Sequence, residues 1–324
     1  MRRFAALWVP FAVVGCLPAD TRPPPAELTV TVSSSPATLE GIPAALTSDG
    51  FDISFERVLA NIGQAELVDG PPGTHCNEYS NPGYTRLFDF KQVGARRELG
   101  IAFATGRCAF GYSVRFPNYA TLLDLGATQK DATLMRTAGS DRVSTDAGVT
   151  VYVEGVAVRG AETKHFAWPF RKRVGYVACG SFDETGHFNS GLGLSSNQKT
   201  SVNLEIHAEG LFGSGPDMLA HFQPFADADA NGDGEIAFDE LWSVPLEAVV
   251  AAGFEPPPDV NVLPPPSDPP APLDPAYSCF DGDGNLIDIK TLGDYAYCEL
   301  LPTIVRFEGT GACTVTLGRS NNDD

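Results

Sequence analysis

Short runs in which apolar and polar residues alternate set the tightest limit on how this chain can fold. They recur between residues 28 and 212, and turn residues bound most of them. Alternation puts every second side chain of a strand on one face, and short strands separated by turns are typical of antiparallel sheets. The clearest runs are Leu28, Val30 and Val32; Phe51, Ile53 and Phe55; Leu99, Ile101 and Phe103; Val149, Val151 and Val153; and Val202, Leu204 and Ile206. With 33 glycines and 26 prolines as turn residues, the sequence predicts a mainly β fold, with a β-rich domain over residues 28–212 built as an antiparallel β-sandwich or open barrel.

Helix is expected to be scarce in the β domain, and the exceptions lie in the EF-hand-like segment, residues 213–254. Two short segments there, 216–223 and 245–252, begin at proline residues and flank an acidic loop. Proline suits the first position of a helix because the backbone N–H that it lacks would have no acceptor within the helix there. The sequence therefore predicts a small helix-loop-helix insertion on the β domain.

A proline-rich stretch at 255–276 follows, and it is expected to be extended, as a linker would be. Three cysteines precede this stretch and three follow it. They are Cys76, Cys108, Cys179, Cys279, Cys298 and Cys313. In an oxidising compartment these six fit three disulfides whose connectivity the sequence leaves open. Because three cysteines cannot all pair among themselves, at least one disulfide should cross the stretch. Residues 277–318 are therefore expected to form a strand-rich tail docked on the β domain, ahead of a polar tail at 319–324.

The N-terminal residues have the order of a secretory signal peptide, predicted over residues 1–15. Two arginines precede an apolar run that is too short to span a bilayer, and Gly15 and Cys16 follow it. The ending at residues 13–16 resembles the lipobox of bacterial lipoproteins, which implies cleavage before Cys16 and lipidation of that residue. Several acyl chains on one residue make a stable membrane anchor. Residues 16–27 are rich in proline and are expected to act as a tether.

Residues 229–240 (DANGDGEIAFDE), called the acidic loop below, match the EF-hand pattern at every chemically constrained position. Calcium prefers a shell of oxygen ligands. The expected ligands are the side chains of Asp229, Asn231, Asp233 and Glu240 and the backbone carbonyl of Glu235. Gly234 falls where the turn requires a positive φ, and Ile236 falls where a short β contact normally holds such a loop to a neighbour. The sequence therefore predicts one calcium ion with a mainly structural role.

Two prolines depart from the full helix-loop-helix pattern. Pro224 is expected to interrupt the entering helix, and Pro245 to fall soon after the exiting helix begins. EF-hands usually come in pairs. The start of the acidic loop is also similar to dockerin repeats, and a dockerin needs two such repeats. The other acidic, glycine-rich stretch, residues 281–286, has Leu286 in place of the turn glycine and is expected to be a hairpin turn.

Three further features have more than one interpretation. Phe166, Trp168 and Phe170 alternate, which favours a buried strand face; exposed rings would instead suit sugar stacking and a carbohydrate-binding module. The basic residues 171–173 are expected to lie on a solvated edge. The five histidines have no metal-ligand spacing and are expected to be satisfied or exposed.

No catalytic motif is present in the sequence, so no catalytic residue is assigned. With 41 acidic against 22 basic residues, the net charge of -19 disfavours nucleic acid as a partner. The lipobox and the acidic loop together resemble those of EF-hand-bearing lipoproteins of Gram-negative bacteria. This resemblance implies calcium and an envelope location, and Leu17 after Cys16 implies the outer membrane. The expected function is that of a non-enzymatic, calcium-binding lipoprotein, anchored to the membrane through Cys16, whose β domain binds a protein or glycan partner. The alternatives are a carbohydrate-binding module and a hydrolase acting on envelope or extracellular polymers.

Overall fold

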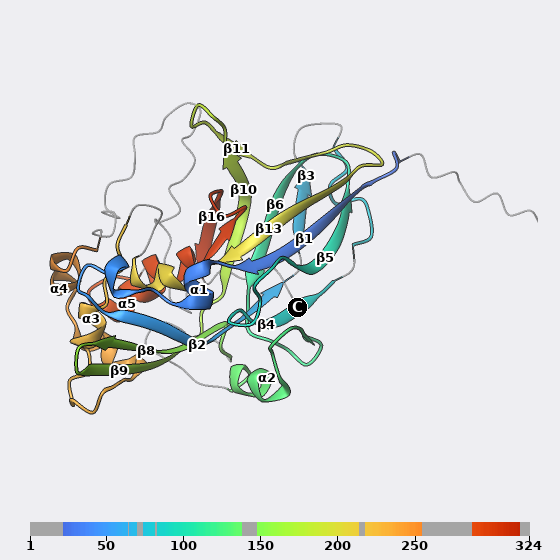
Figure 1. Ribbon diagram of the computed structural model, residues 1–324. Helices are drawn as coiled ribbons and strands as arrows, with labels where there is room; N and C mark the ends of the chain where they lie inside the picture. The colour runs from blue at the N-terminus through green and yellow to red at the C-terminus, as the bar shows by residue number, and fades with distance from the viewer. Residues whose placement is uncertain are drawn as a thin grey trace, which may run out of the picture.

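The computed structural model describes residues 22–63, 65–69, 74–81, 83–137, 148–213, 218–254 and 287–317. Within these ranges the fold is mainly β, with two mixed sheets in a sandwich-like arrangement and few helices (Figure 1). The predicted mainly β fold class, with few helices, is confirmed, and its arrangement is sandwich-like. The predicted signal peptide, Cys16, the proline-rich stretch 255–276 and the polar tail 319–324 lie outside the described residues.

The smaller sheet has four strands in the order β15-β13-β1-β5. They are β1 (Ala26–Ser34), β5 (Arg97–Ala104), β13 (Lys199–Ile206) and β15 (Val305–Phe307). β1 and β13 are parallel, and the other pairs are antiparallel. The prediction of an antiparallel architecture is therefore wrong for the centre of this sheet, where a parallel pair joins two distant parts of the chain.

The larger sheet runs in the order β11-β10-β6-β2-β8-β9-β14, with five more strands off this path. The path consists of β11 (Phe188–Ser190), β10 (Val174–Phe182), β6 (Gly106–Val114), β2 (Asp52–Gly63), β8 (Val151–Arg159), β9 (Glu162–Phe170) and β14 (Glu235–Ile236). β3 (Glu66–Asp69) and β12 (Leu192–Leu194) pair with β6, β16 (Ala312–Leu317) with β10, β4 (Thr85–Asp89) with β2, and β7 (Leu122–Leu123) with β4. The short strand β14 belongs to the acidic loop, so the loop is an edge of this sheet.

The helices are short. The α-helices are α1 (Pro36–Glu40), α2 (Gln129–Met135), α3 (Gln223–Ala226), α4 (Leu246–Ala251) and α5 (Leu292–Tyr295). The 3-10 helices are η1 (Ala44–Leu46), η2 (Ala208–Phe212), η3 (Phe238–Ser243) and η6 (Leu301–Ile304), and η5 (Ala296–Leu300) is a π-helix. In the part of the chain that the structure describes, no helix has the length and apolar character needed to cross a membrane. Figure 1 shows α3, α4 and α5 gathered at one end of the molecule, beside β8 and β9.

Four of the five predicted strand runs bury the expected face, and β5 does not. Val30 of β1 pairs with Gly100 and the next residue pairs with Glu98, so Leu99 is an extra residue in β5. Such a bulge exchanges the inward and outward faces of the strand beyond it. Leu99 is buried as predicted, but Ile101 and Phe103 are only half-buried. Because of this bulge, the alternation of Leu99, Ile101 and Phe103 in the sequence does not place all three on one face of β5.

The C-terminal segment is docked on the body through a strand and a disulfide. β16 pairs with β10, and Cys313 is bonded to Cys179, 134 residues earlier in the chain. This disulfide crosses the proline-rich stretch, as the cysteine count predicts. Residues 287–304 contain helical turns before β15, so the expectation of a strand-rich tail is only partly met.

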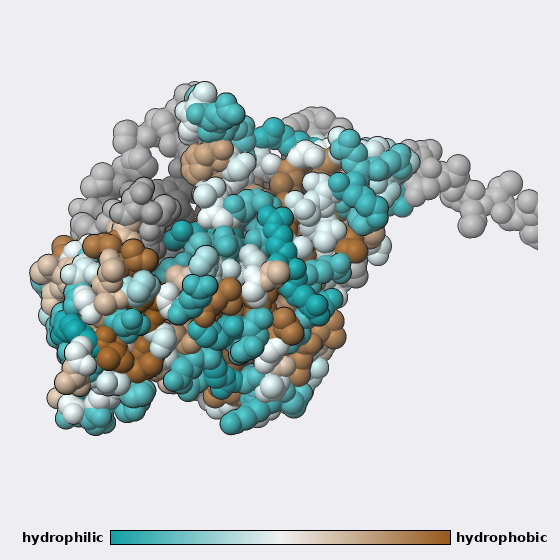
Figure 2. Space-filling view, in the orientation of Figure 1, coloured by the Kyte–Doolittle hydropathy of each residue, from teal (hydrophilic) through white to brown (hydrophobic). Residues whose placement is uncertain are grey.

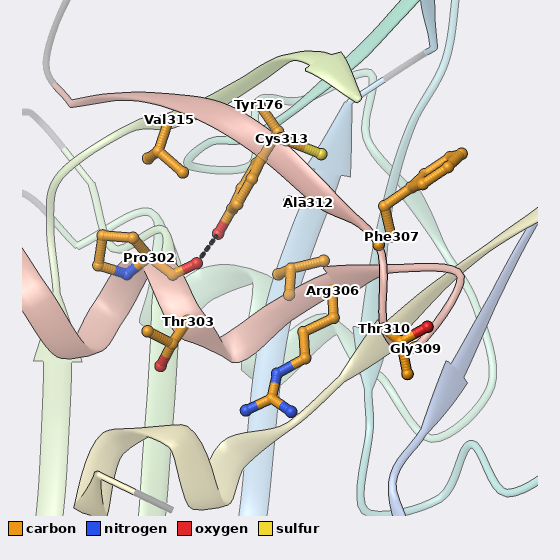
Figure 3. A pocket seen from close by; sticks show the side chains of 12 residues that line it. Tyr176, Pro302, Thr303, Arg306, Phe307, Gly309, Thr310, Ala312, Cys313 and Val315 are labelled. Atoms are coloured by element: carbon orange, nitrogen blue, oxygen red, sulfur yellow. Dashed lines mark hydrogen bonds between the residues drawn. The ribbon is translucent and has the colours of Figure 1, made fainter. Parts of the chain in front are cut away.

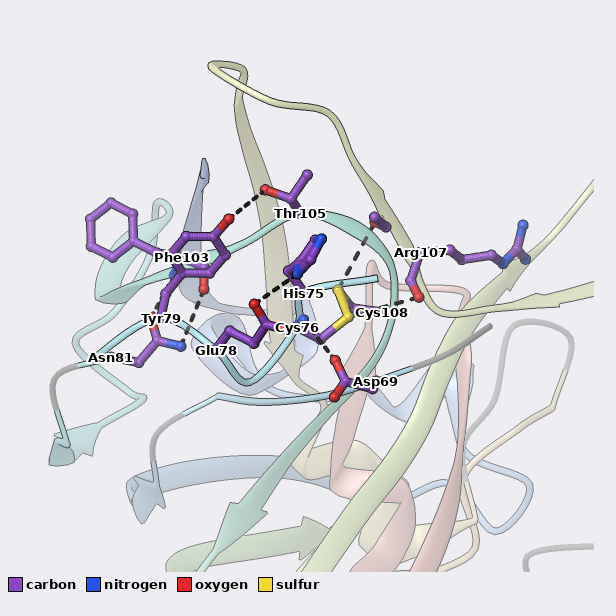
Figure 4. Close-up of a disulfide and its surroundings, with 11 residues drawn as sticks. Asp69, His75, Cys76, Glu78, Tyr79, Asn81, Phe103, Thr105, Arg107 and Cys108 are labelled. Carbon is purple, nitrogen blue, oxygen red and sulfur yellow. Dashed lines mark hydrogen bonds and ion pairs between the residues drawn. A yellow bond between two sulfur atoms is a disulfide. The ribbon is translucent and has the colours of Figure 1, made fainter. Parts of the chain in front are cut away.

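A second disulfide joins Cys76 to Cys108 within the body (Figure 4). Its loop is held by side chains as well, because the backbone N–H of Cys76 donates to Asp69 Oδ1 at 2.8 Å and His75 Nδ1 lies 2.7 Å from Glu78 Oε2. Cys298 is also disulfide-bonded. Cys279 lies outside the described residues.

Candidate calcium-binding loop

A one-turn helix, α3, leads into the acidic loop. Asp49 Oδ2 accepts the backbone N–H groups of Phe222 and Gln223 at 2.6 Å each, which satisfies donors at the start of the helix. Pro224 lies in the first turn, where its missing N–H costs nothing. Pro224 is the second residue of the entering helix, so the prediction that it interrupts this helix is wrong. Residues 218–222 of the predicted helix 216–223 are not helical.

The exit from the loop consists of two short helices rather than one. The 3-10 helix η3 ends at Ser243, and α4 begins at Leu246 with Pro245 as its N-cap. The predicted helix over 245–252 is thus confirmed to within one residue at each end. Pro245 separates the two helices, so it does not break either of them.

Asp229 organises the first half of the acidic loop. Its Oδ1 accepts the backbone N–H of Gly232 at 2.8 Å, and its Oδ2 accepts that of Gly234 at 3.0 Å. The side chain of Asp229 has no exposed surface. Gly234 has a φ of +86°, as the sequence pattern predicts, and this conformation favours glycine. The loop therefore bends around the carboxylate of Asp229.

The other expected ligands also fold back onto the loop's own backbone. Asn231 Oδ1 accepts the N–H of Asp233, and Asp233 Oδ1 accepts that of Glu235, both at 2.8 Å. Glu240 Oε2 accepts the N–H of Ala237 at 2.8 Å and so caps η3. Among the described residues, no three His, Cys, Asp or Glu side chains converge as a metal-binding group. The structure thus brings the predicted ligands into one turn of chain without closing them into a shell.

The main sheet holds the acidic loop from one side. Residues 235 and 236 form β14, which pairs in parallel with His165 and Phe166 of β9. The side chain of Trp168 donates from Nε1 to the carbonyl of Ile236 at 3.0 Å, and Ile236 is 1% exposed. The predicted β contact of Ile236 is confirmed. The neighbour is a strand of the body, in the place where a second EF-hand loop would normally lie.

Lys164, which sequence reasoning did not identify, contacts the first expected ligand. Its Nζ lies 2.6 Å from Asp229 Oδ2. This Lys164 ammonium, together with the N–H groups of Gly234 and Gly232, holds the pKa of the Asp229 carboxyl below its usual value despite the opposing effect of burial. No local pattern in the sequence marks this lysine, because the two residues meet only through the pairing of β9 with β14.

The aromatic residues of β9 form a core face. Phe166, Trp168 and Phe170 are 2%, 0% and 0% exposed, so the interpretation as a buried strand face is confirmed. Trp168 lies against Phe225 of α3, with ring centroids 5.1 Å apart. These rings therefore join the acidic loop to the core, and they offer no surface on which a sugar could stack. The adjacent Lys172 is 1% exposed, so the predicted solvated edge at 171–173 is wrong for this residue.

The histidines are scattered among separate partners. His221 Nδ1 lies 2.6 Å from Ser48 Oγ, and His207 Nδ1 lies 2.8 Å from Glu209 Oε1. Hydrogen bonds from His207 and Ser35 hold the pKa of Glu209 below its usual value, although burial acts in the opposite direction. The expectation of satisfied or exposed histidines fits these contacts.

A cavity of about 330 Å³ lies where the C-terminal segment meets β10 (Figure 3). Tyr176 of β10 reaches into it and donates its hydroxyl to the carbonyl of Pro302 at 3.1 Å. Arg306 is the one charged side chain among the described residues that line the cavity, and none of them is a carboxylate. Hydrolysis of a glycosidic bond uses a pair of carboxyl groups. These lining residues therefore do not supply the acid pair that the hydrolase alternative needs.

The acidic loop is thus the one place where the sequence pattern and the local geometry point to the same chemistry. Relationship to known proteins adds nothing to this assignment. No family model, no curated protein and no solved structure matches the chain.

Proposed function

We propose that this chain is a calcium-binding lipoprotein of the bacterial cell envelope, anchored in the outer membrane through Cys16 and without enzymatic activity. Calcium serves mainly to fix structure, and the β domain binds a ligand or partner. The observation that carries the proposal is the acidic loop itself. An EF-hand sequence pattern is folded around Asp229 with Gly234 at positive φ, and its central strand is paired to the body.

The donor chemistry of the loop fits calcium. The side chains of Asp229, Asn231, Asp233 and Glu240 and the carbonyl of Glu235 offer hard oxygen ligands, which is what this ion prefers. Bound calcium would neutralise the ligand carboxylates of Asp229, Asp233 and Glu240, which stand within twelve residues of chain. It would thereby stabilise the folded loop over the unfolded one.

A structural role is favoured over a switch by the packing of the loop. Sensor EF-hands expose an apolar groove when their helices rotate apart. Here α3 is a single turn, and Phe225 and Leu241, the apolar residues on either side of the loop, are 1% and 0% exposed in the core. A rotation of that kind would have to open the core of the body.

Export is supported by the disulfides. Two disulfides are formed within the described residues, and disulfides persist in oxidising compartments such as the periplasm and the cell surface. The lipid anchor is supported by the sequence around Cys16.

Partner binding is supported by exposed apolar side chains. Leu46, Met218 and Leu219 are 55%, 43% and 47% exposed, and they lie beside the β-bridge between Thr47 and Ala220. Figure 2 shows hydrophobic residues gathered over the end of the molecule that carries α3 and α4. Exposed apolar patches mark surfaces that bind other molecules.

Calcium titration of the chain from residue 17 onward, which contains every described residue, tests the proposal. We expect one site per chain with a Kd of about 0.1 to 1 mM, the range of extracellular modules. Trp168 contacts the loop and Trp242 lies in η3, so tryptophan emission reports the binding. Glu240→Ala should abolish binding, whereas Glu247→Ala, an exposed acidic residue of α4, should leave it unchanged. Absence of binding to the unmodified chain would refute the calcium assignment.

Removal of calcium should also destabilise the fold. At about 10 mM calcium, a Kd of about 0.1 to 1 mM adds about 1.4 to 2.7 kcal/mol to the free energy of unfolding. Urea unfolding in calcium and in excess chelator measures the difference. The same free energy in both conditions would show that any bound ion has no structural role.

A further inference from the structure

Lys164 lies on the core-facing side of β9. It shares that face with Phe166 and Trp168, which are 2% and 0% exposed. His165, which lies between Lys164 and Phe166 in the sequence, faces solvent. The Lys164 side chain itself is only 15% exposed. A buried ammonium is costly unless a carboxylate pairs with it. Its partner is Asp229, the first position of the acidic loop, at 2.6 Å.

Asp229 depends on this contact as much as Lys164 does. Its side chain has no exposed surface, and the loop itself offers it two backbone N–H groups but no positive charge. A buried carboxylate with no charge partner would favour an open loop. The register of β9 fixes Lys164 in place, because Ala157 of β8 pairs with it on one side and β14 pairs beside it on the other.

We propose that the Lys164 ammonium is the built-in counter-ion of the acidic loop, which keeps the loop folded without calcium and lowers its affinity for calcium. The second half of this inference rests on the proposed calcium site, whereas the first half does not. An ammonium and a calcium ion that share one carboxylate repel each other. By Coulomb's law this repulsion lowers the calcium affinity about tenfold, even with the screening of water. The loop is thereby set to bind calcium weakly, and bound calcium adds stability to a loop that the ion pair already folds.

Lys164→Met tests both halves, because it keeps the length of the side chain and removes the charge. We expect the variant to bind calcium about tenfold more tightly, as measured by tryptophan emission. In excess chelator it should melt at a lower temperature than the unmodified chain. Saturating calcium should remove most of the melting difference. The matched control is Lys199→Met, since Lys199 pairs with Glu27 at 2.9 Å on the surface and is 77% exposed. Both of its readouts should equal those of the unmodified chain.

A second variant covers the case in which Lys164→Met is too unstable to study. Adding Asp229→Asn to it removes the unpaired carboxylate, so melting in chelator should recover toward the unmodified value. A double variant no more stable than Lys164→Met would overturn the counter-ion role.

The outcomes separate this inference from the calcium site. If the unmodified chain binds calcium and Lys164→Met binds it equally or more weakly, the inference is wrong and the site stands. If only the variant binds calcium, the ammonium takes the place of the ion in the natural chain, which supports the inference. If neither binds calcium, the proposed function fails, and the melting temperatures in chelator alone decide the counter-ion role. A lower melting temperature for Lys164→Met than for the unmodified chain supports this role, and an equal one overturns it.

Discussion

Replacing Cys179 and Cys313 together by serine is expected to lower the free energy of unfolding by about 4 to 5 kcal/mol. The disulfide closes a segment of 134 residues, and the chain-entropy cost of closing a loop grows with its length. It also ties β16 to the body across the proline-rich stretch. Urea unfolding of the oxidised chain and of the double variant measures the loss.

The second disulfide supplies the matched control for this experiment. Cys76 and Cys108 are 32 residues apart, so their replacement by serine should cost less, about 3 to 4 kcal/mol. A loss below about 1 kcal/mol for the Cys179 and Cys313 pair would show that the pairing of β16 with β10 holds the C-terminal segment without help.

Phe212→Ala is expected to lower the free energy of unfolding by about 3 to 5 kcal/mol, the usual cost of removing a buried aromatic ring. Phe212 is fully buried, and its ring packs on those of five other residues at centroid distances of 5.3 to 6.0 Å. They are Phe55, Phe166, Trp168, Phe222 and Phe225. Because Trp168 and Phe225 hold the acidic loop, calcium affinity should fall in the same variant.

Tyr119→Ala is the control for that substitution, because Tyr119 is 94% exposed. Its change in the free energy of unfolding should stay within about 0.5 kcal/mol. If Phe212→Ala unfolded as the unmodified chain does, the ring cluster would not be the centre of the core.

Much of the fold follows from local sequence patterns. Alternation identifies β1, β2, β8 and β13, since each buries one face of a strand and the period of two residues is visible in the sequence. The parity of the cysteines identifies a disulfide across the proline-rich stretch without identifying its members. The positions of Gly234 and Ile236 in the acidic loop follow from the EF-hand pattern.

The rest depends on contacts between distant segments, which no local pattern records. The bulge at Leu99 reverses the burial of Ile101 because β1 imposes its own register on β5. Lys164 meets Asp229 only because β9 pairs with β14. The sequence predicts that Pro224 interrupts a helix, but in the structure this helix begins at Gln223, one residue before it. A proline in the first turn leaves a helix intact, so its effect depends on where the helix starts.

The parallel pairing of β1 with β13 also bears on how the protein reaches its fold. Glu27 of β1 pairs with Lys199 of β13, 172 residues later in the chain. Contacts so distant in sequence form slowly, because the intervening chain must first be brought together. β5 can cover one edge of β1 early, but the other edge stays open until residues 199–206 are present. In the proposed lipoprotein, the strand next to the membrane tether would therefore be among the last to resist proteolysis during export, and periplasmic chaperones would meet β1 with one edge still unpaired.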